Sequence, residues 1–381
     1  MKRVLFIGHE ATRTGAPIVL LSLLRWLKSK DFPYKIDLLL LQGGELEDEY
    51  RNLVDNLYLM PQPQFGRKGL LERLINRFKK EFCLAREYPR MAPFDQKYEK
   101  VLANTAISLK VLKPFKEKGA KTICWIHELE YSIKELCGLD EFVKASKFVD
   151  SFIACSKAVQ QMLQKVVTGK EVYLAYDFTE GFREISYEEI EMTKAELGIP
   201  KDAFVIGGCG TIHWRKGVDI FIYLARKLSK IQGRNFYFVW LGKKLPSFES
   251  ERILYDFERI EVNNRIVFAG SQVDVARFFA CFDVFALTSR EDPFPLVCLE
   301  AASLGKPIIC FEKAGGMPEF VGSDAGKVVP YGDIDAFCQE IINFHDNPKK
   351  LEECGRTARK KLMTDFSAEN SCRKICELLL K

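Results

Sequence analysis

The residues with the clearest chemical potential lie between positions 288 and 319, TSREDPFPLVCLEAASLGKPIICFEKAGGMPE. Two carboxylates, Asp292 and Glu300, stand eight positions apart there, and Gly315 and Gly316 follow them. Carboxylates accept hydrogen bonds from sugar hydroxyls, and free N–H groups at the start of a helix bind phosphate. This combination of groups predicts a binding site for a sugar nucleotide.

The apolar segments around these carboxylates indicate which elements position them. Residues 283–287, DVFAL, are typical of a buried strand that ends in the polar loop holding Asp292. The loop opens a helix, and the helix leads to a second apolar strand at 307–311. The start of that helix brings the backbone N–H groups of Leu296 and Val297 near Asp292, and we expect them to contact phosphate. A plain helix N-cap is the alternative role for Asp292.

A second stretch, GGCGTIHWRKG at 207–217, follows one apolar strand and precedes an amphipathic helix. Glycines allow the backbone to approach a phosphate closely, and two adjacent cations neutralise a diphosphate. We therefore expect Arg215 and Lys216 to hold the diphosphate of a donor and to stabilise it as a leaving group. The alternative is a pair of solvated charges, although cations at the start of a helix oppose its dipole.

Polar residues also end two strands in the first half of the chain. His127 follows the predicted strand 122–126, and Asn104 follows the one at 100–102. Ligands of parallel α/β sheets bind outside the carboxyl ends of the strands, so both side chains are well placed to contact a substrate. For His127, a structural histidine with satisfied hydrogen bonds is the alternative.

Strand-like and helix-like segments alternate along the whole chain, which predicts parallel sheets with crossover helices. The polar stretch 179–202 separates two such series, so we predict two Rossmann-like domains with a ligand between them. The predicted strands are 4–7, 36–41, 57–60, 100–102, 122–126, 151–154 and 172–174 in the first series, and 204–209, 236–241, 265–268, 283–287, 307–311 and 327–329 in the second.

Composition excludes several classes of protein. The chain has 381 residues, 47% of them hydrophobic, and no apolar run reaches the roughly 18–20 residues that span a bilayer. The basic and apolar N-terminus, MKRVLFIGHE, is too short in its apolar part for a signal peptide and predicts a first strand. The twelve cysteines form no CxxC or zinc-finger spacing, which favours reduced thiols in the cytoplasm and no metal site.

Residues 65–90, FGRKGLLERLINRFKKEFCLAREYPR, concentrate the charge of the chain. Eight basic and three acidic residues leave +5 there, which equals the formal net charge of the whole protein. A basic amphipathic helix can bind an anionic membrane surface, whereas a helix that packs its apolar stripe on the core is the alternative. Because the charge is local and no binding motif accompanies it, we expect no nucleic-acid partner.

Taken together, the two glycine-containing stretches resemble the donor-binding signature of retaining glycosyltransferases with the GT-B fold, specifically family 4 (glycosyl transferases group 1). That family has an acidic residue, seven others and then Glu, followed by Gly-Gly and Glu. Asp292, Glu300 and Glu319 match these positions, although Asp292 replaces the usual Glu. Pro295 stands where the family usually has Gly, so one backbone N–H donor is absent.

The resemblance implies roles for individual residues. Asp292 would contact the donor sugar and Glu300 the ribose hydroxyls, while a solvent-facing helix position is the alternative for Glu300. His127 would lie near the anomeric carbon, and Gly15, in the loop HEATRTGAP at 9–17, near the donor phosphate. The predicted site residues are catalytic His127, Arg215, Lys216 and Asp292; donor-binding Gly15, Arg215, Lys216, Asp292, Phe294, Leu296, Val297 and Glu300; and acceptor-side Asn104 and His127.

The resemblance also implies an architecture. It gives an α/β GT-B fold whose two parallel sheets face a cleft. Residues 1–178 would form the acceptor-side domain, 179–202 a linker and 203–362 the nucleotide-sugar domain. Residues 363–381 would form a C-terminal helix that crosses back onto the first domain.

The implied activity is the transfer of a sugar, with retention and without a metal or other cofactor, from a nucleoside diphosphate sugar to a glycan or lipid-linked acceptor. Such enzymes build cell-surface polysaccharides or glycolipids, in the cytoplasm or on the inner face of the membrane. Two alternatives remain open from the sequence. One is a sugar-nucleotide 2-epimerase of the same fold, and the other is a non-catalytic protein that binds sugar nucleotides.

Overall fold

The computed structural model describes residues 2–61, 91–262 and 264–381 and divides into two compact units. The first comprises residues 1–177 with 368–381, and the second comprises residues 178–367. The segment 179–202, expected to be a linker, belongs to the second unit and contains helix α8 (Tyr187–Glu196). The basic segment 65–90, considered above as a membrane-binding helix, lies outside the described residues.

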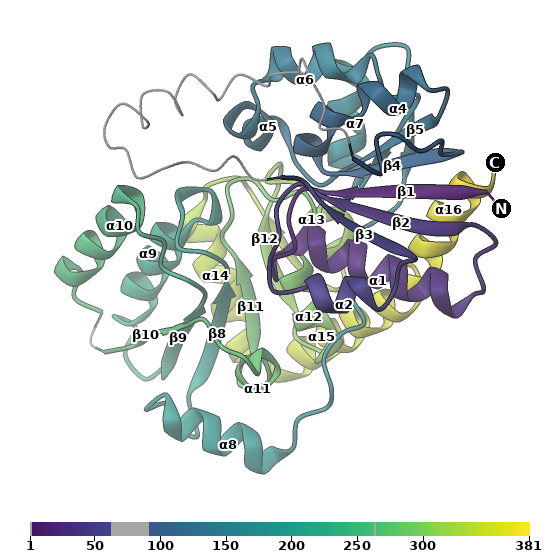
Figure 1. The fold of residues 1–381 in the computed structure, drawn as a ribbon. Helices are drawn as coiled ribbons and strands as arrows, with labels where there is room; N and C mark the ends of the chain where they lie inside the picture. The colour runs from purple at the N-terminus through teal and green to yellow at the C-terminus, as the bar shows by residue number, and fades with distance from the viewer. Residues whose placement is uncertain (1, 62–90, 263) are drawn as a thin grey trace. The chain divides into compact units, whose positions relative to one another are not determined.

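A seven-stranded, all-parallel sheet forms the centre of the first unit, in the order β3-β2-β1-β4-β5-β6-β7 (Figure 1). Its strands are β1 (Arg3–Gly8), β2 (Lys35–Leu40), β3 (Asn56–Leu59), β4 (Lys100–Asn104), β5 (Lys121–Ile126), β6 (Ser151–Ala154) and β7 (Glu171–Leu174). The strand order reverses between β1 and β4, where Gly8 is paired with Asn104. Ligands of open α/β sheets bind at such a reversal.

Helices cover this sheet because its central strands are buried over almost their whole length. They are α1 (Gly15–Ser29), α2 (Glu47–Arg51), α4 (Lys113–Glu117), α5 (Glu130–Leu136), α6 (Leu139–Ser146), α7 (Lys157–Val166) and the 3-10 helix η1 (Ala106–Val111). The C-terminal helix α16 (Ala368–Leu380) packs against α1 (Figure 1). There the indole Nε1 of Trp26 donates to Glu369 over 2.6 Å, and Lys100 Nζ donates to the Leu378 carbonyl over 2.8 Å.

The second unit is built on a six-stranded parallel sheet in the order β10-β9-β8-β11-β12-β13. Its strands are β8 (Phe204–Cys209), β9 (Phe236–Leu241), β10 (Ile266–Gly270), β11 (Val284–Leu287), β12 (Ile308–Phe311) and β13 (Gly326–Val329). The helices are α8, α9 (Val218–Leu228), α10 (Phe248–Arg259), α11 (Val275–Ala280), α12 (Leu296–Ser303), α13 (Met317–Val321), α14 (Ile334–Asp346), α15 (Pro348–Met363) and the 3-10 helix η2 (Trp214–Lys216). The order reverses between β8 and β11, so the loops after these strands meet at one edge.

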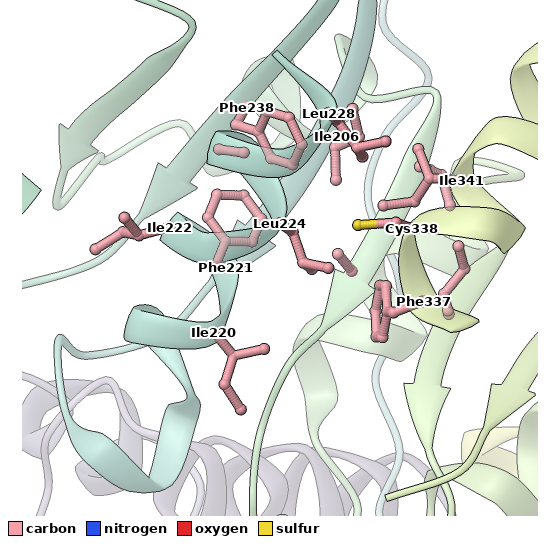
Figure 2. Packing of buried hydrophobic residues seen from close by; sticks show 14 of the residues in the cluster. Ile206, Ile220, Phe221, Ile222, Leu224, Leu228, Phe238, Phe337, Cys338 and Ile341 are labelled. Atoms are coloured by element: carbon pink, nitrogen blue, oxygen red, sulfur yellow. The ribbon is translucent and has the colours of Figure 1, made fainter. Parts of the chain in front are cut away.

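Helices α9 and α14 pack over one face of this sheet and form its apolar core (Figure 2). Phe221 of α9 contacts Phe238 and Trp240 of β9 edge-on, with ring centroids 5.4 and 5.0 Å apart. Phe337 and Ile341 of α14 complete the layer and are fully buried. This core fixes the start of α9, which follows directly on the loop that holds Arg215 and Lys216.

All thirteen predicted strands occur in the structure, and the two parallel sheets confirm the predicted pair of Rossmann-like folds. The cysteines of the described residues are eleven in number, and all of them are free thiols. Most are buried among apolar side chains.

Replacement of Phe221 by alanine tests how strongly the core supports the second unit. Deleting a fully buried phenylalanine ring removes its transfer energy and leaves a cavity, so the free energy of unfolding should fall by about 3–5 kcal/mol. Urea denaturation followed by far-UV circular dichroism measures the change. Tyr223→Ala on the same helix is the control, because that side chain is 40% exposed and its loss should cost far less.

Candidate functional site

The loop after β8 turns sharply before α9, and this turn presents Arg215 and Lys216. Gly217 joins η2 to α9 in the left-handed conformation, with φ of 66°. A Cβ at this position would lie 1.9 Å from the carbonyl oxygen of Thr288, so only glycine fits. The 3-10 turn therefore lies directly against the loop that follows β11.

Asp292 lies in that second loop and binds both cations of the first. Lys216 Nζ lies 2.7 Å from Asp292 Oδ2, and Arg215 Nη1 lies 3.9 Å from Asp292 Oδ1. The Ser289 hydroxyl also donates to Oδ2 over 3.0 Å. The structure thus brings together three of the four residues predicted to be catalytic.

The electrostatics of this group favour the charged form of Asp292. Asp292 is only 5% exposed, and burial alone would raise the pKa of its carboxyl. The facing charges of Lys216 and Arg215 outweigh burial and hold the pKa below its usual value. The arrangement is consequently a buried ion pair with a second cation beside it.

The backbone of Asp292 shows that it is not an N-cap. Helix α12 begins four residues later, after Pro295, and no side chain caps it. Instead, Asp292 N donates to the carbonyl of Ala314 over 2.7 Å, in a bridge that also pairs Asp292 with Gly315. Gly315 has φ of 143°, and a Cβ there would meet the Asp292 carbonyl oxygen at 1.7 Å. Gly315, the first glycine of the Gly-Gly turn, therefore lets the two backbones approach closely, and this contact fixes the position of Asp292.

Glu300 occupies an unusual position for a carboxylate. It is half-buried on α12, between fully buried Leu299 and Ala301, and its side chain has no hydrogen-bond or ion-pair partner in the described part of the chain. Burial raises the pKa of its carboxyl to about 7. The Glu300 carboxylate also raises the pKa of the Cys209 thiol at the end of β8, although burial is the larger cause. Glu300 therefore faces the same strand ends as Lys216, with its hydrogen-bonding capacity unused.

The start of α12 contributes backbone groups. Leu296 and Val297 are its first two residues, whose N–H groups point out of the helix without an acceptor in the preceding turn. Phe294 differs from the other predicted donor-binding residues because its ring is buried and stacks on Phe366, with centroids 5.8 Å apart. This ring packs the loop against the end of α15.

Arg290 is a site residue that the sequence analysis missed. Its guanidinium donates to both carboxylate oxygens of Asp219 over 2.8 and 2.6 Å and to the Trp214 carbonyl over 2.7 Å. Its central carbon also lies 4.8 Å from the Trp214 ring centroid. A fourth contact joins Arg290 N to the Arg215 carbonyl over 2.8 Å. Arg290 thus clamps η2 from the β11 side, a role that no local sequence pattern indicates.

In the first unit, His127 and Asn104 meet at the ends of β5 and β4. His127 Nε2 lies 2.8 Å from Asn104 Oδ1, and His127 Nδ1 lies 2.9 and 3.0 Å from the two oxygens of Asp177. Asp177 had no place among the predicted site residues. Gly15 begins α1, and a Cβ added there would meet no atom within 4 Å, so packing gives no reason for glycine.

Among the described residues, His127, Cys155 and Asp177 form a group of three potential metal-ligand atoms, all within 4.8 Å of one another. These atoms already interact, because the imidazole faces Asp177 and the Cys155 thiol donates a hydrogen bond to the same carboxylate. Within the described ranges, no helix is long and apolar enough to cross a bilayer.

The two parallel-sheet, Rossmann-like units match the fold of solved GT-B glycosyltransferases. HepE of Anabaena in complex with UDP-glucose superposes with a TM-score of 0.78 at 19% identity, covering 100% of this chain and 99% of HepE. The lipopolysaccharide glycosyltransferase WaaG gives a TM-score of 0.71 at 14% identity, covering 98% and 99%. Residues 189–361 match the family model described as glycosyl transferases group 1.

The curated relatives of this chain include a synthase and a glycosyltransferase. The alpha-galactosylglucosyldiacylglycerol synthase of Streptococcus pneumoniae is 24% identical over 278 residues, which cover 67% of this chain and 70% of the synthase. The lipopolysaccharide core biosynthesis glycosyltransferase LpsD of Rhizobium meliloti is 28% identical over 176 residues, 46% of this chain and 49% of LpsD.

Lys216→Met tests the buried ion pair. Removing one partner leaves Asp292 with weaker compensation, and the free energy of unfolding at pH 7 should fall by about 3 kcal/mol. Without Lys216, burial raises the pKa of Asp292, so the loss should shrink as the pH is lowered and the carboxyl becomes neutral. Urea denaturation at several pH values measures this, and adding Asp292→Asn should restore most of the stability. An unchanged stability in Lys216→Met would contradict the pairing.

Arg290→Lys tests the clamp on η2. Lysine keeps the positive charge but loses the bidentate hydrogen bonds to Asp219 and the stacking on the Trp214 ring. The opening free energy of the Gly217 amide should drop by about 1.5–3 kcal/mol, measured by hydrogen exchange. Arg226→Lys, at an exposed arginine of α9, is the matched control. Equal exchange in both variants would show that Arg290 does not hold the turn.

Proposed function

We propose that this protein is a retaining glycosyltransferase that takes its donor, a nucleoside diphosphate sugar, in the second unit. The observation that supports this most is the unpartnered, half-buried Glu300 carboxylate beside the start of α12 and the Lys216–Asp292 pair. A carboxylate in such surroundings gains most from a ligand that donates hydrogen bonds, as a ribose diol does.

The predicted residues Glu300, Arg215, Lys216 and Asp292 then have places in the proposed reaction. Glu300 accepts hydrogen bonds from the ribose hydroxyls, while Arg215, Lys216 and the N–H groups that begin α12 bind the diphosphate. Asp292 orients Lys216 through their ion pair and contacts the sugar. These positive groups are partly buried, and they stabilise the negative charge that develops on the departing diphosphate.

The proposed transfer balances without a further cofactor. The bond between the anomeric carbon and the diphosphate oxygen breaks, and a bond from the acceptor hydroxyl oxygen to that carbon forms on the same face. The proton of the hydroxyl passes to the departing phosphate oxygen, so no protein carboxylate acts as a nucleophile. Charge on the leaving group is neutralised by Arg215 and Lys216, which is why we propose that no metal is needed.

The acceptor is proposed to be a glycan or a lipid-linked sugar in polysaccharide or glycolipid synthesis. The printed names of the relatives support this class, since they refer to a glycolipid synthase and to lipopolysaccharide core synthesis. The basic segment 65–90 stays a predicted contact with an anionic membrane surface on the cytoplasmic side. Uridine is the first donor base to test, because HepE binds UDP and UDP-glucose.

Thermal stability against UDP-, GDP-, ADP-, CMP- and dTDP-sugars identifies the donor. A ligand at a hundredfold excess over its Kd should raise the free energy of unfolding by about 2.7 kcal/mol. The gain should disappear in Glu300→Ala and Lys216→Ala, with Glu258→Ala, at an exposed position of α10, as a folded control. If no donor stabilises the well-folded protein, the proposed function is wrong. Binding without turnover on any acceptor would instead indicate a non-catalytic sugar-nucleotide-binding protein.

The raised pKa of Glu300 predicts how donor affinity depends on pH. With a pKa of about 7, the carboxyl is mostly neutral at pH 6 and mostly ionised at pH 8, and only the ionised form accepts hydrogen bonds through both oxygens. Affinity for the intact sugar nucleotide should therefore rise up to about tenfold across this range, as measured by calorimetry. Glu300→Gln should bind more weakly and should lose this pH dependence. A flat wild-type profile would exclude the ribose contact.

The same pKa shift fixes the sign for stability without ligand. Because the folded pKa lies above the usual glutamate value of 4.5, the contribution of Glu300 to stability is fully present below that value. It is lost as the pH rises to about 7, since the unfolded chain ionises first. Ligand binding and ligand-free folding thus respond to pH in opposite directions at this one residue.

A further inference from the structure

The groups that face the two ring nitrogens of His127 indicate which of these nitrogens carry a proton. Its Nδ1 faces both oxygens of the Asp177 carboxylate at 2.9 and 3.0 Å, and its Nε2 faces Asn104 Oδ1 at 2.8 Å. The orientation of the Asn104 amide is fixed independently, because its Nδ2 donates to the carbonyl oxygen of Ala16 over 3.0 Å. Both ring nitrogens consequently face hydrogen-bond acceptors.

A neutral imidazole has only one N–H and would place a lone pair against one of these oxygens. A ring with both nitrogens protonated satisfies both contacts. We propose that Asp177 and Asn104 hold His127 as a permanent imidazolium, and that this residue positions the start of α1 and does not exchange a proton during turnover. Asp177 is then a positioning residue that sets the charge of His127.

The charged and titratable groups around the ring support this state. Burial acts to lower the pKa of His127, but the charge and the hydrogen bond of Asp177, together with the charge of Glu128, outweigh it and raise the pKa. Glu128, the next residue, accepts hydrogen bonds from the amides of Ala106 and His127, and burial raises its pKa. The Cys155 thiol after β6 donates to Asp177, and His9 after β1 acts on Glu128 through its charge. Asp177 is therefore the partner in direct contact with the ring.

The network also joins several elements of the first unit. Asn104 ends β4, His127 follows β5, Asp177 follows β7, and Ala16 lies in the first turn of α1. The neighbouring Thr105 is buried in a strained conformation, with φ of 85°, although it is β-branched. Such strain persists only where the surrounding contacts fix the backbone. The position of Asn104 is thus fixed by the protein, and it transmits the position of His127 to α1.

Nitrogen-15 NMR of the imidazole groups in the full-length protein tests the proposal without any ligand. The chain has four histidines, and His127→Gln assigns the relevant signal. Both nitrogens of His127 should give the chemical shifts of protonated nitrogen at pH 7.5, and the midpoint should lie above the ordinary value near 6.5. In Asp177→Asn the midpoint should fall below that value, because burial is then opposed only by the charge of Glu128.

A neutral His127 ring at pH 7.5 in the wild-type protein would overturn the proposal. The titration of the wild-type protein determines the charge of His127 even if Asp177→Asn fails to fold. A shift of the His127 signal on adding Zn²⁺, reversed by EDTA, would also overturn it, because the ring would then be a metal ligand together with Cys155 and Asp177.

The expected effect on catalysis rests on the proposed function, and it is measured separately through the pH dependence of kcat/KM. The kcat/KM of the wild type should show no titration of His127 between pH 6 and 8, whereas that of Asp177→Asn should fall as the pH rises through this range, because the ring of His127 then loses its proton. A wild-type acid limb that His127→Gln abolishes would show that the ring exchanges a proton. If no transfer activity is found, the proposed function fails while the NMR result still decides the charge of His127.

Discussion

The buried ion pair between Lys216 and Asp292 joins the two loops on which the rest of the second unit's site depends. The loops follow β8 and β11, the two strands between which the order of the sheet reverses. Gly217 and Gly315 allow the backbones to approach closely enough, and Arg290 holds the β8 loop from the other side. A buried pair of this kind adds little net stability, but it fixes where the charges lie. That fixed position is what the binding of a diphosphate requires.

Around this pair, the structure leaves one carboxylate and one helix start without protein partners. Glu300 has no partner among the described side chains, and the first N–H groups of α12 have no acceptor within their own helix. Unused hydrogen-bonding groups at a strand edge cost free energy in the ligand-free protein. A ligand with a diol at one end and a diphosphate at the other repays this cost at both places. Such a ligand agrees with the match of residues 189–361 to the family model of glycosyl transferases group 1.

Much of the fold could be predicted from the sequence because parallel strands buried on both faces are short, continuous apolar segments. The strand, helix and strand of the β11–α12–β12 unit, which carries Asp292 and Glu300, could be predicted for the same reason. The N-cap alternative for Asp292 was excluded only by the structure, since Pro295 moves the start of the helix. Arg290 and Asp177 were missed because their partners, Asp219 and His127, lie 71 and 50 positions away. Contacts of that kind depend on the tertiary fold and leave no local pattern.

Hydrogen exchange of the full-length protein with and without a saturating sugar nucleotide tests the central claim most directly, because it locates the donor on the chain. If the second unit binds the donor as described, protection should appear at the amides of residues 210–217 and at the start of α12, including Leu296 and Val297. Protection confined to other segments, with these two regions unchanged under saturating donor, would contradict the account.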